Sequence, residues 1–214
     1  MASRNQLIPD SRATQTDQKN YVIEAVAAGL ERCQLKGIGN LNADIPGLES
    51  IAAKDLRVRV DLIKKYLQTG LWPKSIEMAP LDPTTELVAA TALDDWLTAA
   101  LAVVGTFYTC TQAIVAPQML AGKLMVCWGV SLANAPQNVS KLRFRKGGAA
   151  ANIVAEFDLQ ELETKQEACG FFAEPVIYDP QDIFAIQARC QNVTGVAERV
   201  YIRNFVFGTP TRTV

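Results

Sequence analysis

Residues 124–132 have the sequence LMVCWGVSL, and this stretch decides the fold class of the chain. Every second residue from Leu124 to Leu132 is large and apolar, and the residues between them form a second, mostly smaller set. A period of two places successive side chains on opposite faces of an extended backbone. The stretch therefore predicts a β-strand with one strongly apolar face.

Similar patterning continues on both sides of this strand. Further strands are predicted at residues 102–110, 139–146, 153–159, 182–190 and 199–207. One short helix is expected around residues 159–166, and residues 86–97 fit a helix or a buried strand equally well. Because parallel strands need long, usually helical connections, many strands with few helices predict antiparallel sheets. We therefore expect residues 84–214 to form an antiparallel β-sandwich, and the uneven loops favour a jelly-roll arrangement.

The first part of the chain, residues 1–83, contains few aromatic residues and shows helical spacing instead. Leu56, Val60, Ile63 and Leu67 form one apolar stripe along a helix that ends at Gly70. A second helix is predicted from about residue 17 to residue 33. The glycines and proline of residues 34–50 predict a loop, and the prolines of residues 71–85 predict an extended connector. Residues 1–83 are thus expected to form a helical N-terminal arm with a Pro-containing connector.

The apolar stripe of this arm needs a cover. A leader of this size with two amphipathic helices buries a modest core by itself. The cover can be the C-terminal domain, a sister subunit or another protein, and the pattern leaves these three open. We take Leu56, Val60, Ile63 and Leu67 as the candidate assembly interface of the arm, and expect the β domain to stay folded without residues 1–70.

The composition excludes several classes of function. Hydrophobic residues make up 49% of the 214-residue chain and charged residues 20%, which is typical of a globular protein. The 21 basic residues are balanced by 22 acidic ones, so broad nucleic-acid binding is not expected. The chain has no histidine, which removes imidazole bases, Ser-His and Cys-His pairs and imidazole metal sites. We expect no catalytic residues, no cofactor and no metal.

Neither the cysteines nor the uncharged segment at residues 96–122 indicates a metal site or a membrane span. The five cysteines show no C-x-x-C spacing, which favours buried free thiols over disulfides or a thiolate metal site. Residues 96–122 carry no charge, but their threonines, Gly105 and Pro117 suit strands better than a membrane span. The first ten residues contain no apolar signal segment, so synthesis in the cytoplasm is expected and no membrane contact.

A row of cations is the most visible charged feature. In a strand over residues 139–146, Lys141, Arg143 and Arg145 share one face. They can contact an anionic partner, with an acidic subunit preferred over nucleic acid, or they can form a solvated face that protects an edge strand. The acidic pair Asp179 and Asp182 fits a turn in which aspartate bonds to nearby backbone amides, and Gly147-Gly148 fits a hairpin turn.

Three segments together resemble a known group of proteins. They are VAEFDL at residues 154–159, GFFAEPVIYDP at 170–180 and FAI at 184–186. Over about residues 100–214 the chain resembles the strand order of single jelly-roll structural proteins of viruses and bacteriophages. The resemblance implies a capsid, minor capsid or decoration subunit that works as a symmetric oligomer in the virion, after synthesis in the host cytoplasm. The resemblance assigns no catalytic residues to this chain. Residues 1–83 lack the basic arm of many small coat proteins, which argues against direct genome packaging.

The sequence therefore predicts a non-enzymatic structural protein of a virus or phage particle, with other copies and other virion proteins as partners. A carbohydrate- or receptor-binding β-sandwich module is the alternative. In that case Phe171, Phe172 and Tyr178 would provide the aromatic platform for a glycan.

Overall fold

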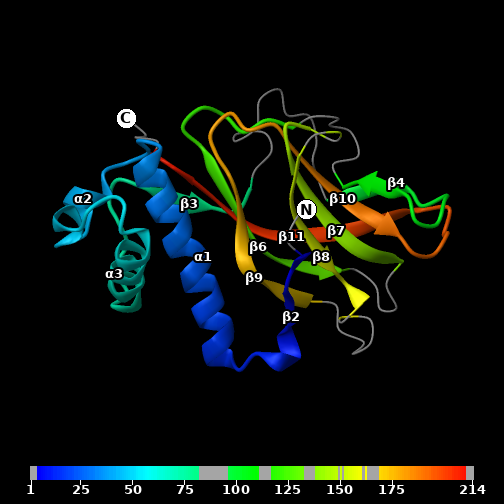
Figure 1. Cartoon of the computed structure of the whole chain (residues 1–214), viewed down its shortest axis with the longest axis horizontal. Helices are drawn as coiled ribbons and strands as arrows, with labels where there is room; N and C mark the ends of the chain where they lie inside the picture. The colour runs from blue at the N-terminus through cyan, green and yellow to red at the C-terminus, as the bar shows by residue number, and fades with distance from the viewer. Residues whose placement is uncertain are drawn as a thin grey trace.

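Two β-sheets packed face to face form the body of the molecule, and helices from the N-terminal part lie against the outer face of one sheet (Figure 1). This arrangement comes from a computed structural model. It describes residues 4–81, 96–110, 117–132, 138–148, 150, 152–160, 162 and 169–210. The predicted antiparallel β-sandwich is confirmed, with the helices as a third layer.

The first sheet, sheet A, has the strand order β1-β8-β7-β10-β5. Its members are β1 (Arg4–Asn5), β5 (Phe107–Thr109), β7 (Val139–Lys146), β8 (Asn152–Asp158) and β10 (Phe184–Cys190). The short β1 joins β8 in parallel, and the other pairs are antiparallel.

The second sheet, sheet B, has the order β2-β9-β6-β11-β3, and β4 also pairs with β11. Its members are β2 (Leu7–Pro9), β3 (Glu77–Ala79), β4 (Leu97–Ala100), β6 (Leu124–Leu132), β9 (Cys169–Tyr178) and β11 (Ala197–Gly208). All these pairs are antiparallel.

The strand pairs are nested along the chain. β7 pairs with β8, β6 with β9, β5 with β10 and β4 with β11. Each pair encloses the previous one in sequence, and successive pairs alternate between sheet A and sheet B. Two further pairs, β7 with β10 and β6 with β11, then join the nested pairs within each sheet.

Strand β6 has the predicted bounds and is buried on both faces. Met125 and Cys127 face the core between the sheets, whereas Leu124 and Val126 face the helices. The pairing of β6 with β9 shifts between Cys127 and Gly129. Beyond this bulge Val130 and Leu132 belong to the core between the sheets. A bulge adds one residue, so beyond it the side chains that would have pointed to one face of the strand point to the other. For this reason the regular apolar alternation predicted a single apolar face, whereas the structure buries apolar residues of β6 on both faces.

Aromatic side chains fill the core between the sheets. Phe157 of β8 stacks on Phe172 of β9 with ring centroids 3.9 Å apart, and Phe144 of β7 meets Phe157 edge to face at 5.6 Å. Phe144 and Phe157 belong to sheet A and Phe172 to sheet B, and Phe144 also meets Phe172 edge to face at 5.4 Å. The contacts of Phe172 with these two rings therefore hold the two sheets together.

The helical layer contains α1 (Gln15–Leu35), α2 (Leu41–Asp44) and α3 (Leu56–Gln68), with single 3-10 turns η1 (Asp10–Arg12) and η2 (Leu48–Ser50). Thr14 and Asp17 form a capping box at the start of α1, which satisfies two backbone donors there. α1 packs on β6, β9 and β11, and α3 packs on α1. Both predicted helices are confirmed.

Some segments differ from the sequence-based predictions. Residues 34–50 contain α2 and η2, so the predicted loop is partly helical. Residues 169–178 form the long strand β9, which the alternation did not single out because its buried and exposed positions are irregular. Residues 86–95 of the segment 86–97, and residues 161 and 163–166 of the helix expected at 159–166, lie outside the described residues.

The close approach of α1 to sheet B depends on Gly29. A Cβ atom there would lie 2.7 Å from Phe207 Cε2 and 2.8 Å from Val126 Cγ2, and both neighbours are fully buried. We expect Gly29→Leu to lower the free energy of unfolding by about 1–3 kcal/mol, because the packed layer cannot take up the added volume. Urea denaturation measures the effect. The control Lys19→Leu, at an exposed position of α1, should stay within about 0.5 kcal/mol of the wild type, and an equal loss at both positions would contradict the argument.

Candidate functional site

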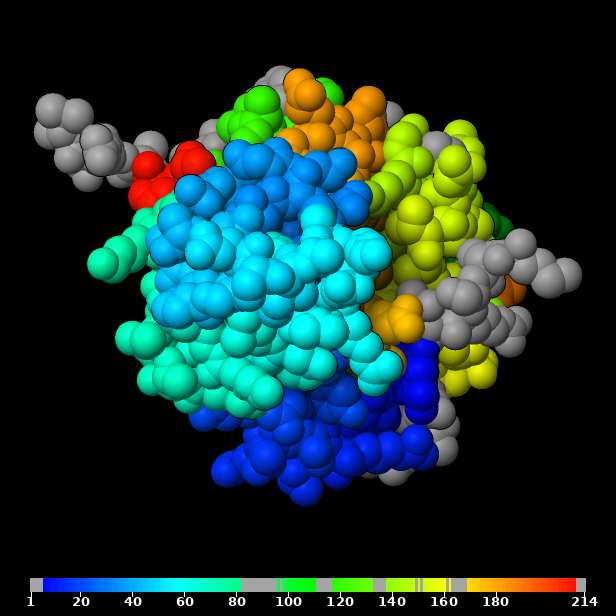
Figure 2. All heavy atoms as spheres, turned by 60° about the vertical axis from the view of Figure 1, so that its left-hand side comes forward, coloured from blue at the N-terminus to red at the C-terminus, as the bar shows by residue number. Residues whose placement is uncertain are grey.

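The junction between the helical arm and the sandwich has a buried apolar cluster of its own. Val26, Leu30 and Cys33 of α1 pack with Val126 and Phe207 of sheet B in one buried cluster. In the space-filling view the arm, coloured blue to cyan, covers one face of the molecule, and the sandwich is visible at its margins (Figure 2). The apolar outer face of sheet B is therefore covered by residues of the same chain.

The predicted apolar stripe of the arm lies largely inside this junction. Ile63 is 0% exposed, and Val60 and Leu67 are partly buried against the same cluster. Leu56, at the start of α3, is 46% exposed. The chain's own fold thus provides most of the cover that the stripe needs. The role of the four residues in contacting a neighbouring subunit remains a prediction, and within the stripe it applies best to Leu56.

A buried arginine connects the helices of the arm. Arg59 Nε donates to Glu31 Oε1 at 2.7 Å, and its Nη1 donates to the carbonyl oxygens of Leu48 and Ile51 at 2.9 and 3.1 Å. Its Nη2 donates to Asn42 Oδ1 at 3.1 Å. Arg59 therefore ties α1, α2, η2 and α3 together. Removing either member of a buried ion pair leaves an uncompensated charge, which makes such pairs costly to break.

The sequence analysis did not single out Arg59 or Glu31. One signal was present in the sequence: Arg59 precedes Ile63 by four residues, so the two share the same face of α3. A charged residue on an apolar helix face indicates a buried partner. The identity of that partner, 28 positions away along the chain, follows only from the packing of α1 on α3.

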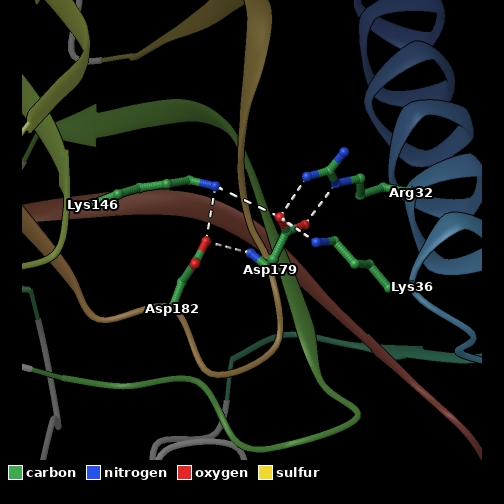
Figure 3. A network of polar contacts seen from close by, with 5 residues as sticks. All are labelled: Arg32, Lys36, Lys146, Asp179 and Asp182. Atoms are coloured by element: carbon green, nitrogen blue, oxygen red, sulfur yellow. Dashed lines mark hydrogen bonds and ion pairs between the residues drawn. The ribbon is translucent and has the colours of Figure 1, made fainter.

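A polar network fastens the end of α1 to the sandwich (Figure 3). Arg32 Nε donates to Asp179 Oδ1 at 2.7 Å and Arg32 Nη2 to Asp179 Oδ2 at 2.5 Å, while Lys36 Nζ lies 3.1 Å from Asp179 Oδ2. Lys146 of β7 pairs with Asp182 at 2.8 Å. We call these five residues the Asp179 clamp. It joins α1, the turn between β9 and β10, and sheet A.

The turn that carries Asp179 has the predicted local structure. Asp182 Oδ2 accepts a hydrogen bond from the backbone N–H of Asp179 at 2.8 Å, which confirms the aspartate-stabilised turn. Gln181 between them has φ of 65°, a left-handed conformation that is unfavourable for a residue with a side chain. Burial raises the pKa of Asp179, but hydrogen bonds from Arg32 and Lys36 and the nearby Lys146 outweigh it and lower the pKa from 3.8 to about 2.

The predicted row of cations lies on the outer face of sheet A and is paired within the chain. Arg143 Nη2 lies 2.8 Å from Glu156 Oε2, and Lys141 Nζ lies 3.5 Å from Glu156 Oε1. Arg145 Nε donates to Gln187 Oε1 at 2.8 Å. The Arg143 guanidinium also stacks over Phe107, 3.6 Å from the ring centroid. The structure brings the three cations together as predicted, whereas their contact with an anionic partner stays a prediction.

Other candidates from the sequence carry no reactive arrangement. Cys33, Cys110, Cys127 and Cys190 are buried free thiols, as predicted, and Cys169 is partly buried. Burial raises the pKa of Cys33 and of Cys110 to about 12, which opposes formation of the nucleophilic thiolate. Within the described ranges, no three cysteine, aspartate or glutamate side chains are placed to hold a metal ion.

The aromatic residues suggested as a glycan platform are in the interior. Phe171 and Phe172 are almost fully buried and Tyr178 is fully buried. Their rings stack on other protein rings: Phe171 on Trp128 and Tyr21, and Phe172 on Phe157. These three side chains therefore offer no open ring face to a sugar, and this part of the prediction was wrong because strand β9 faces packed layers on both sides.

Comparison of the chain with models of protein families, with curated protein sequences and with solved structures found no match. Among the helices that the structure describes, none is both long enough and apolar enough to cross a bilayer. What can be said of the function therefore depends on the fold and on the contacts described above.

A pair of alanine substitutions in α3 tests whether the stripe is covered within the chain. We expect Ile63→Ala to lower the free energy of unfolding by about 2–5 kcal/mol, because it leaves a cavity in a closed cluster. Leu56→Ala on the same helix should change it by less than about 0.5 kcal/mol, because Leu56 is exposed. Both values are measured by urea denaturation at low protein concentration. A similar small effect at both positions would mean that the arm is not docked on its own sandwich.

The Asp179 clamp predicts a pH-dependent contribution to stability. The pKa of Asp179 is lower in the folded chain than its ordinary value, so the ionised carboxylate stabilises the fold above about pH 4, and this is lost as the pH falls toward 2. We expect Asp179→Asn to cost about 1–2 kcal/mol near neutral pH, since solvent screens the part-exposed Arg32 and Lys36, and almost nothing at pH 2. Thermal unfolding of both proteins over this pH range measures the difference. Asp61→Asn, at an exposed position of α3, serves as the control and should show no such trend.

Proposed function

We propose that this protein is a structural subunit of a virus or phage particle, built on a jelly roll and carrying a helical arm. The observation that carries the proposal is the nested pairing of β4 with β11, β5 with β10, β6 with β9 and β7 with β8. A jelly roll is an eight-stranded, two-sheet antiparallel fold of paired Greek keys. When a long hairpin folds into such a sandwich, its strands form four nested antiparallel pairs, and successive pairs lie in alternate sheets.

The distribution of chemistry supports an assembly role over catalysis. The charged groups that the structure describes in detail hold elements together: Arg59 within the arm, the Asp179 clamp between arm and sandwich, and Glu156 across sheet A. The chain carries a formal net charge of −1, so copies can approach one another without strong long-range repulsion.

The docked arm supports a rigid building block. Because α1 covers sheet B and β1 and β2 add strands to both sheets, the N-terminal part is integrated with the sandwich. A rigid subunit has less conformational entropy to lose on assembly than a flexible one. The fold therefore suits a particle in which the sandwich and the outer surface of the arm, including the exposed Leu56, contact neighbouring copies.

Self-assembly of the purified full chain tests the proposal. We expect sedimentation velocity to show a concentration-dependent shift from small species to one large species of uniform size, visible by negative-stain electron microscopy as closed particles or regular oligomers. Leu56→Asp should weaken this assembly at least about tenfold, because it places a charge in an apolar contact, while Lys54→Ala should assemble as the wild type does. A chain that stays monomeric at every concentration would overturn the proposal, and normal assembly of Leu56→Asp would exclude the arm contact.

A further inference from the structure

A groove lies between the edges of the two sheets, on the side of the sandwich where the N-terminal segment crosses from one sheet to the other. β1 pairs with β8 of sheet A at Glu156 and Phe157, and β2 pairs with β9 of sheet B from Gly170 to Phe172. In Figure 1 this segment, coloured dark blue, lies between β8 and β9. The groove is next to it and has a volume of about 200 Å³. It is lined by Lys146 of β7, Val154 and Ala155 of β8, and Glu174, Pro175, Val176 and Ile177 of β9.

Both strands that border the groove have a free backbone edge there. β1 pairs with β8 only at Glu156 and the residue after it, so within the described residues the stretch 152–155 has β7 on one side and no strand on the other. On the outer side of β9, the pairing with β2 ends with a hydrogen bond from Ala173 N to Gln6 O at 3.0 Å. In the part of the chain that the structure describes, no strand continues along 174–177. Unpaired N–H and C=O groups on a strand edge are a template for an added strand.

The groove fits an extended peptide better than a small molecule. Its volume is below the roughly 300–1,000 Å³ that is typical of small-molecule pockets. An added strand lies along the edges instead and places only alternate side chains inside. Pro175 has no N–H to donate, so we expect the hydrogen bonds of an added strand to be made mainly with β8, while the side chains of β9 form the other wall.

Glu174 gives the groove a negative charge. Its side chain is exposed and makes no hydrogen bond or ion pair with any residue that the structure describes. The other charged residue of the lining, Lys146, lies 2.8 Å from Asp182 Oδ2 through its Nζ, so its charge is balanced within the Asp179 clamp. Charge complementarity therefore favours an extended occupant with a basic side chain beside Glu174.

The chain itself contains one segment with this chemistry outside the described residues. Residues 211–214, Thr-Arg-Thr-Val, follow Pro210, the last described residue. They combine Arg212 with three β-branched residues, which are favoured in strands. The remaining undescribed stretches of two or more residues carry either no charged side chain or an excess of acidic ones: 1–3, 82–95, 111–116, 133–137 and 163–168.

The same chain cannot place Arg212 beside its own Glu174. Phe207 and Tyr178 pair with adjacent residues of β6, the strand between β11 and β9. Gly208 therefore lies two strands from β9, about 10 Å, and two residues beyond the level of Tyr178. Because Glu174 precedes Tyr178 by four residues, Gly208 and Glu174 are about 20 Å apart along the strand direction and about 22 Å apart in total. Arg212 follows Gly208 by four residues, which span at most about 14 Å.

We infer that residues 211–214 of a second copy enter this groove as an added strand, with Arg212 beside Glu174. Groove and segment are different parts of the chain, so the contact is head-to-tail, and contacts of this kind close into rings or continue as filaments. Four residues bury far less than the roughly 800 Å² per partner of a stable interface. A single contact is therefore weak, and it becomes significant where each copy both gives and receives a segment. The inference does not depend on the assembly being a virus particle.

A charge exchange between groove and segment tests the inference. The probe is a fluorescein-labelled peptide of residues 208–214, titrated with the full chain and followed by fluorescence anisotropy. We expect Glu174→Arg to weaken binding at least about tenfold, because like charges then face each other. A peptide with Arg212→Glu should bind the Glu174→Arg chain at least about tenfold more tightly than it binds the wild type. The control Glu49→Arg makes the same change at an exposed position of the arm and should bind the unchanged peptide as the wild type does. Absence of peptide binding, or binding that ignores the exchange, would overturn the inference.

Disulfide cross-linking tests whether the occupant is a second copy. Val154→Cys, at the groove, and Thr213→Cys would be oxidised as a mixture of two full chains that carry different tags. We expect linked dimers of the two chains at least about tenfold faster than when Val58→Cys, at an exposed valine of the arm, replaces Val154→Cys. The wild type, with its native cysteines, sets the background. Equal rates at groove and control, or a disulfide that forms only inside a chain carrying both new cysteines, would overturn the inference.

Deletion of residues 211–214 separates this inference from the proposed function. The shortened chain should keep its thermal unfolding temperature, because the contact is between copies, and should self-associate at least about tenfold more weakly. Particles that form equally well from the shortened chain would overturn the groove contact and leave the proposed function in place. Groove cross-linking in a chain that never forms particles would support the groove contact and overturn the proposed function.

Discussion

The burial of strand β6 on both faces is the constraint on which the rest of the structure depends. Met125, Cys127, Val130 and Leu132 face the core between the sheets, and Leu124 and Val126 face the helices. A strand of this kind cannot lie on the surface of a two-layer sandwich, because one apolar face would remain in water. The arm must therefore cover sheet B, and the close contact of Gly29 with Val126 and Phe207 allows α1 to lie near enough to do so.

Polar contacts define how the arm is placed on that apolar surface. Hydrophobic burial is not directional, so it does not by itself fix the position of α1 along the sheet. Arg59 sets the relative positions of the arm's helices through contacts with four residues, and the Asp179 clamp fixes the end of α1 on the turn after β9. Ion pairs with buried or partly buried members are sensitive to geometry. They give a single docking position to a layer that apolar packing alone would leave free to slide.

The consequence for function is a division of the molecular surface. The apolar outer face of sheet B is closed by the arm, and the outer face of sheet A carries cations that are paired within the chain. Exposed apolar side chains lie in the loops after β4 and β10 and along the arm, for example at Leu56 and Val58, and single ones lie on the strands, such as Val154 of β8. This distribution supports the proposal of a building block that contacts neighbouring copies through its exposed loops and its arm.

The sequence by itself determined the two amphipathic helices, the strands at residues 124–132 and 139–146, the antiparallel class of the sheets and the turn at Asp179 and Asp182, because each of these depends on local periodicity or on turn chemistry. Only the tertiary structure decided which partner covers the apolar stripe of the arm, that Glu31 is the partner of Arg59, and that Phe171, Phe172 and Tyr178 lie inside. The bulge in β6 and the irregular strand β9 show the physical reason. Hydrophobic alternation indicates that a side chain is buried, but whether it is buried by a sheet, a helix or another subunit depends on which distant elements pack together, and that information is not contained in the local pattern.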